Sequence, residues 1–150
     1  MHRKISYIRD LEVIEKELNN SSGGILAFNV DGEKVAQYLT TFLYHDKNIY
    51  FFLEKEDEIY EKMNFNNFGS FTILKDEKLR KNRAVPYHLF SATITGLLKI
   101  VDEKKMIEEI KHRYLTKYGL RKVGDGRSSH TRELIMIDSQ EIQAIEEEGA

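Results

Sequence analysis

Residues 24–74 decide the fold, and they read GILAFNVDGEKVAQYLTTFLYHDKNIYFFLEKEDEIYEKMNFNNFGSFTIL. An apolar segment, 25–30, leads into Asp31-Gly32, a pair suited to the positive φ angles of a tight hairpin turn. Residues 34–44 are rich in β-branched and aromatic types, and after a second polar turn another apolar segment follows at 49–53. This order predicts a meander of antiparallel strands.

The segment 34–44 is predicted to be one long strand with apolar residues on both faces. A strand covered on both faces usually lies in a barrel wall that also packs on a helix, a partner subunit or a ligand. A chain of 150 residues is too small to cover both faces itself, so the pattern predicts a homodimer. The two faces carry Val35, Gln37, Leu39, Thr41 and Leu43 on one side and Ala36, Tyr38, Thr40, Phe42 and Tyr44 on the other.

Three helices are expected. Apolar residues recur at helical spacing over 5–19, which predicts an amphipathic helix. A short helix is expected from Asp57 to about Asn64, because its first turn is acidic, as the helix dipole prefers. A longer helix is expected at 103–118, capped by the preceding Asp102 and stopped by the following Gly119.

Further strands are predicted at 69–75 and 87–101, and Gly96 within the second indicates a bulge or sharp bend. Residues 133–145 are expected to form a strand pair or one bent strand. About six strands, mostly consecutive, together with three helices predict an α+β fold built on a small antiparallel barrel, as one domain over 1–150.

Composition excludes several classes of protein. The net charge of −2 gives no case for nucleic acid or membrane binding. Cysteine is absent, which excludes disulfides and thiol catalysis and fits a reducing compartment. No apolar run resembles a secretory signal or a transmembrane helix, so a cytoplasmic protein is expected. The 5 histidines show no HxH or HExxH spacing, so no metal site is predicted.

Five short segments, taken in order, resemble the FMN-binding split barrel of the pyridoxamine 5′-phosphate oxidase-like superfamily. They are a hydrophobic-x-Phe-aromatic strand at 49–53, a short helix at 57–63, an Asn-x-x-x-Ser strand entry at 66–70, a Gly-x-x-x-x-Val strand at 96–102 and an Arg-Tyr-Leu-x-x-Tyr helix end at 113–118. The resemblance implies a split β-barrel homodimer with one FMN in each of two interface clefts, and a flavin-linked oxidoreductase acting on a small molecule.

The resemblance also implies which residues contact the cofactor. The strand that contacts the flavin ring falls on 37–42, partly through its backbone, and a second strand ends against the flavin at 52–53. A residue that helps to hold the phosphate falls on Ser91. No catalytic residue is implied, because no Ser-His-Asp or paired-carboxylate arrangement can be read in the sequence. The implied contacts are Gln37, Tyr38, Leu39, Thr40, Thr41, Phe52, Leu53 and Ser91.

The sequence departs from the family pattern at the phosphate. Flavin-binding members typically place adjacent basic residues at the start of the short helix, and those positions are Glu58 and Ile59 here. A phosphate dianion needs cations or clustered N–H donors. If FMN binds, we expect Lys55 or Lys62, assisted by the Ser91 hydroxyl, to replace the missing cations.

Two alternatives stay open. Related split-barrel proteins bind or process haem, some through one histidine, and His112 and His130 are the candidates here. The second alternative is a non-enzymatic ligand-binding protein that has lost the family's phosphate contacts. Residues 120–131 form a polar, glycine-containing segment that is a candidate to close over a ligand.

Overall fold

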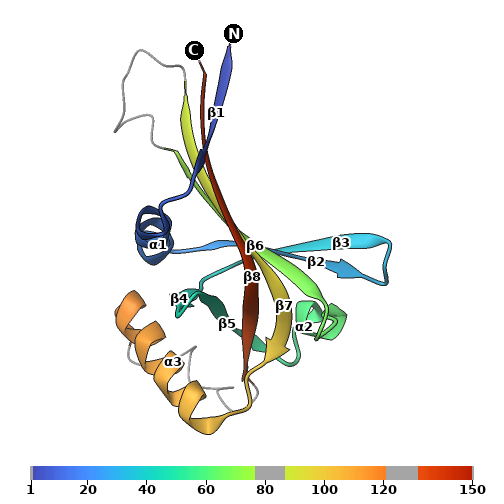
Figure 1. Cartoon of the computed structure of the whole chain (residues 1–150). Helices are drawn as coiled ribbons and strands as arrows, with labels where there is room; N and C mark the ends of the chain where they lie inside the picture. The colour runs from blue at the N-terminus through green and yellow to red at the C-terminus, as the bar shows by residue number, and fades with distance from the viewer. Residues whose placement is uncertain (1, 77–86, 121–131, 150) are drawn as a thin grey trace.

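The computed structural model describes residues 2–76, 87–120 and 132–149, which contain eight strands and three helices (Figure 1). The strands are β1 (Arg3–Ile8), β2 (Gly24–Val30), β3 (Lys34–Thr40), β4 (Leu43–His45), β5 (Asn48–Glu54), β6 (Phe68–Asp76), β7 (His88–Ile100) and β8 (Arg132–Gly149). The helices are α1 (Leu11–Asn20), α2 (Glu58–Lys62) and α3 (Lys104–Tyr118).

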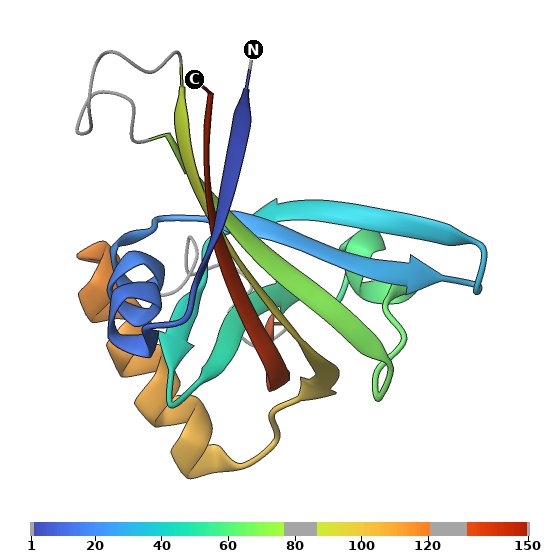
Figure 2. The same ribbon diagram turned by 45° about the horizontal axis from the view of Figure 1, so that its top comes forward.

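The eight described strands belong to one antiparallel sheet. Seven follow the order β3-β2-β6-β7-β8-β5-β4, and β1 lies off this path and pairs with β8. Strand β8 is the centre of the arrangement, because β7 runs along one of its edges while β5 and then β1 pair with the other. The twisted strands fan out around the interior without closing into a barrel (Figure 2). The expected α+β split barrel is confirmed, with two more strands than expected.

Gly96 produces the bend that its position predicts. Thr95 pairs with Glu141 whereas Gly96 pairs with Ser139, so Gln140 is an extra residue in β8. A Cβ atom on Gly96 would overlap the carbonyl oxygen of Asp138, so only glycine permits this approach. The C-terminal segment is therefore one bent strand and not a strand pair.

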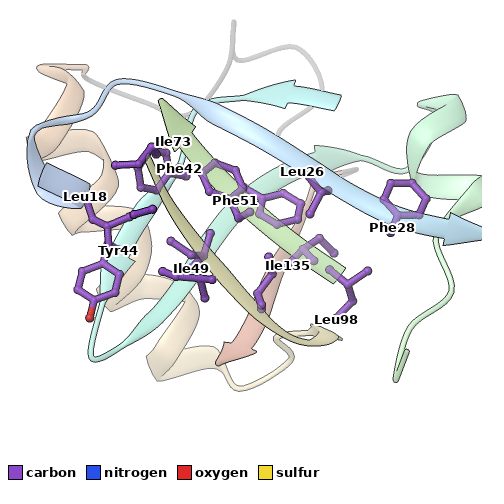
Figure 3. Packing of buried hydrophobic residues seen from close by; sticks show 14 of the residues in the cluster. Leu18, Leu26, Phe28, Phe42, Tyr44, Ile49, Phe51, Ile73, Leu98 and Ile135 are labelled. Atoms are coloured by element: carbon purple, nitrogen blue, oxygen red, sulfur yellow. The ribbon is translucent and has the colours of Figure 1, made fainter. Parts of the chain in front are cut away.

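The main core lies inside the curved sheet. Phe42, Phe51 and Phe71 are completely buried there, and the rings of Phe42 and Phe71 pack with centroids 4.7 Å apart. Figure 3 shows Leu18 of α1 closing one end of this cluster. Because burial of one large apolar side chain contributes about 1.5–3 kcal/mol, this cluster is the main source of stability.

A second apolar cluster lies between α3 and strands β4, β5 and β8. Ile110 and Tyr114 are its buried helix residues, and Ile107 packs beside them. The helix begins after Glu103 rather than Asp102, and no side chain caps it. Gly119 ends it in the left-handed conformation, with φ of 64°, as predicted.

Two predictions about local structure are wrong. The expected helix over 5–19 begins only at Leu11, because residues 3–8 pair with β8 as strand β1 and the Asp10 side chain caps α1 by accepting from the Glu12 backbone N–H. The expected single strand over 34–44 ends at Thr40, and β4 is a separate short strand.

Candidate functional site

The sheet exposes an unusual amount of apolar surface on the side away from the core, which we call the outer face. Strand alternation puts Val35, Leu39 and Leu74 on this face, and they are 69%, 73% and 70% exposed. Strand register places Ile25 directly opposite Leu39. The exposed apolar side chains of the outer face are Ile5, Tyr7, Ile25, Val35, Leu39, Phe68 and Leu74.

The predicted ring-contacting strand divides between the two faces of the sheet. Gln37 lies exposed on the outer face between Val35 and Leu39, opposite Ala27. The side chain of Tyr38 points inward and is half-buried; burial, together with Asp57 and Glu54, raises its pKa. Thr40 is half-buried on the same inner side. Of residues 37–40, therefore, Gln37 and Leu39 reach the outer face.

Thr41 and Phe52 both contact Tyr114, a residue that the sequence did not indicate as part of a site. The Thr41 hydroxyl is hydrogen-bonded to the hydroxyl of Tyr114, and the ring of Phe52 lies edge-on to Tyr114 with centroids 5.2 Å apart. Burial raises the pKa of Tyr114, which keeps its hydroxyl protonated. Leu53, by contrast, is 2% exposed in the core, so it can offer a ligand only its backbone.

The surroundings of α2 do not fit a phosphate. The Lys55 ammonium lies 3.0 Å from the Glu133 carboxylate, which raises the pKa of Lys55. Arg132 is likewise paired with Glu54 at 2.9 Å. Lys62 is exposed at the end of the helix. Acidic residues outnumber these cations on α2 and its neighbouring segments; they are Glu54, Glu56, Asp57, Glu58, Glu61 and Glu133.

Ser91 does not lie beside α2. It pairs in β7 with Leu74 and Ile145, on the outer face. The segment after α2 instead meets the other end of β7, where the Asn66 N–H donates to the Leu98 carbonyl over 2.7 Å. Leu98 lies seven positions after Ser91, which is about 23 Å along a strand. Within one subunit, Ser91 cannot share a phosphate with Lys55 or Lys62.

A groove of about 610 Å³ lies elsewhere, between α1, β4 and α3; we call it the α1–α3 groove. Figure 1 shows β4 between the two helices. His112, the described haem candidate, lines it, whereas His130 and residues 121–131 lie outside the described residues. The residues lining the groove are Asn19, Leu43, Tyr44, His45, Glu109, His112, Arg113, Thr116 and Lys117.

The end of α3 holds the chain where β3 stops. The Tyr118 hydroxyl accepts from the Phe42 N–H over 3.0 Å and lies 2.8 Å from the Ser22 carbonyl, to which it donates. Burial raises the pKa of Tyr118 to about 12. The Lys117 ammonium donates to the Phe42 carbonyl over 2.9 Å. These side chains replace the strand partners that Phe42 lacks, which explains the break after Thr40.

Two kinds of feature are missing from the part of the chain that the structure describes. No three His, Cys, Asp or Glu residues are grouped there in a way that could hold a metal ion. None of its helices is long and apolar enough to cross a membrane.

No protein-family model and no curated protein matches the sequence. Solved structures do match. A proposed 5-nitroimidazole antibiotic resistance protein from Bacteroides thetaiotaomicron has a TM-score of 0.81 at 12% identity, over 99% of this chain and 90% of that chain. An FAD-binding protein from Mesorhizobium loti has a TM-score of 0.72 at 19% identity, over 95% of this chain and 97% of that chain.

A third solved structure carries the name of the family. A proposed pyridoxamine 5′-phosphate oxidase from Corynebacterium glutamicum has a TM-score of 0.64 at 15% identity, over 97% of this chain and 95% of that chain. At these identities the likeness shows the fold. The chain has the split-barrel fold of the pyridoxamine 5′-phosphate oxidase-like superfamily, as the resemblance in sequence predicts.

Proposed function

We propose that the protein is a homodimer that binds a flavin at the subunit interface and acts as a flavin-linked oxidoreductase on a small molecule. The observation that carries this proposal is the outer face, where Gln37 lies exposed between the apolar side chains of Val35 and Leu39. An amide beside apolar surface can hydrogen-bond the polar edge of a flavin ring while its neighbours cover the ring. Structural neighbours named as flavin-binding proteins support the same cofactor.

The outer face also supports the homodimer. Exposed apolar surface of this extent on a sheet is typical of a protein–protein interface. A two-fold dimer would set the face against its own copy, so each apolar strand would be covered by the partner. Small residues with hydroxyl groups lie at the centre of the outer face, where a partner sheet could approach closely. The hydroxyls of Thr72 and Thr93 are hydrogen-bonded to each other over 2.9 Å, so they do not need water as a partner.

The residues of this chain fit the ring of a flavin better than its phosphate. The carboxylates around α2 would repel a dianion, and Lys55 is already paired with Glu133. Ser91 can help Lys55 or Lys62 to hold a phosphate only from the partner subunit. We therefore propose that binding depends on the ring, with Gln37 orienting it and the apolar side chains of Val35 and Leu39 covering it against water. A bound flavin would supply hydride or electron transfer.

The test is titration of the purified protein with riboflavin, FMN and haemin, followed by visible absorption and flavin fluorescence. Saturable binding of a flavin is expected, and Gln37→Ala should weaken it by about tenfold because one hydrogen bond to a buried polar edge is lost. Lys105→Met, an exposed residue of α3 outside the outer face, is the control. Binding of neither flavin nor haemin would leave a ligand-binding protein without a redox cofactor.

The homodimer is tested separately by sedimentation. Val35→Lys combined with Leu39→Lys should yield monomers, because two charges would be buried in the interface. Val13→Lys changes an exposed apolar residue of α1 and should leave the dimer intact. A monomeric wild-type protein at micromolar concentration would remove the basis for an interface cleft.

Haem is the second candidate, because His112 lines the α1–α3 groove. Haem needs apolar surface against both faces of its ring. The groove instead presents Glu109, Arg113, Thr116 and Lys117 along its helical wall. A Soret band on titration with haemin that is lost in His112→Ala would reverse this preference.

A further inference from the structure

The α1–α3 groove combines a charged wall with an apolar floor. Leu43 and Tyr44 of β4 form the floor and are 7% and 6% exposed. The wall is a stripe of α3 in which residues recur at intervals of three and four, so they share one side of the helix. This stripe consists of Glu109, His112, Arg113, Thr116 and Lys117. The groove volume of about 610 Å³ is in the range of small-molecule sites.

Lys117 is the unusual member of this wall. Its ammonium lies 3.8 Å from the centroid of the Phe42 ring and donates to the Phe42 carbonyl. Burial lowers its pKa to about 8. Among the described residues it makes no ion pair. A half-buried cation without a carboxylate partner costs stability, and such a group in a cleft is a candidate for binding.

The other charges of the groove leave room for an anion. Glu109 is the one carboxylate among the lining residues, and it is already shared between Arg113, at 3.3 Å, and His45, at 3.5 Å. Only the Nε atom of Arg113 is used in this contact, so its terminal nitrogens remain for a ligand. Glu15 of α1 accepts a hydrogen bond from the Tyr44 hydroxyl over 2.8 Å.

We propose that the α1–α3 groove binds a small molecule with an anionic group, either phosphate or carboxylate, held by Lys117 and Arg113. The non-polar part of the ligand lies on Leu43 and Tyr44, and the Thr116 hydroxyl and the Asn19 amide supply polar contacts. The site lies apart from the outer face and does not depend on the proposed flavin. An anion beside Lys117 supplies the ion pair that this lysine lacks among the described residues.

The experiment is titration with three probes at constant ionic strength, followed by two-dimensional NMR. Inorganic phosphate and phenyl phosphate test the phosphate, and benzoate tests the carboxylate. Saturable shifts are expected at Leu43 and Thr116, and phenyl phosphate should bind more tightly than inorganic phosphate because its ring covers the apolar floor. The probe with the highest affinity identifies the anionic group.

Two variants and one control place the site. Lys117→Met and Arg113→Gln should each weaken binding by about tenfold or more, since each removes one charge-assisted contact. Lys105→Met removes an exposed charge from the same helix outside the groove and should bind as the wild type does. The proposal is overturned if no probe binds saturably, if the shifts lie elsewhere, or if both groove variants bind as tightly as the wild type.

Discussion

Lys117 makes the stability of the fold depend on pH in a way that one substitution isolates. Its pKa falls from the ordinary 10.5 to about 8 because burial disfavours the charged form. Below pH 8 the lysine is charged in both the folded and the unfolded state, and the cost of burying the charged ammonium lowers the free energy of unfolding in full. Between the two values the unfolded chain binds more protons, so stability rises with pH. Above 10.5 the cost has gone.

The size of the effect follows from the two pKa values. Their difference corresponds to at most roughly 3 kcal/mol. Because the side chain is only half-buried, solvent screening reduces this to about 1–2 kcal/mol. Lys117→Met keeps the length of the side chain and removes the charge. The Tyr118 hydroxyl lies 2.9 Å from the Phe42 carbonyl and can donate to it in place of the Ser22 carbonyl once the Lys117 ammonium is gone.

The assay is urea unfolding of both proteins at about pH 7 and about pH 10, since tyrosine titration is common to both and cancels in the comparison. The free energy of unfolding of Lys117→Met minus that of the wild type should fall by about 1–2 kcal/mol from the lower pH to the higher pH, because the wild type recovers the cost of burying the charge. Lys105→Met, an exposed lysine of the same helix, should show no such change. A difference between Lys117→Met and the wild type that stays constant or grows with pH would refute the assigned cost of burial.

Three further predictions concern α2, the bulge and the end of α3. Glu58→Lys should improve the affinity for FMN relative to riboflavin severalfold, more at low salt than at high salt; an unchanged ratio in fluorescence titration would place the phosphate away from α2. Gly96→Ala should lower the free energy of unfolding by more than about 2 kcal/mol in urea, because its Cβ would overlap the Asp138 carbonyl, and wild-type stability would contradict this. Tyr118→Phe should cost about 1–3 kcal/mol in thermal unfolding by leaving the Phe42 N–H without its partner, and an unaltered Tm would show that water replaces the hydroxyl.

The parts of the fold that the sequence predicts correctly are those determined within a few residues. Asp31 and Gly32 both take positive φ in the hairpin turn, and Gly119 does so at the end of α3. Each of these positions has a local steric requirement, and the residue type alone reveals it.

The errors arise where a distant segment changes the outcome. The spacing of apolar residues before Leu11 is compatible with a helix, but pairing with β8 makes residues 3–8 a strand. The strand over 34–44 is interrupted because Tyr118, 76 positions further along the chain, takes the hydrogen bonds of Phe42. Tertiary contacts of this kind override local propensity, and no local pattern announces them.

The two candidate sites differ in how far the sequence alone could predict them. Apolar residues on both faces of 34–44 predict a face that one subunit cannot cover, and Val35 and Leu39 are exposed on such a face. The α1–α3 groove needs three elements to meet, yet one part of it is visible in the sequence: the charged stripe of α3 that begins at Glu109. From the sequence alone, that stripe is indistinguishable from a solvated helix face. The structure shows that Lys117 is half-buried against Phe42 and has no carboxylate partner among the described residues. Burial of a charge, and not its presence in the sequence, separates a candidate binding group from ordinary surface, and only the folded structure contains that information.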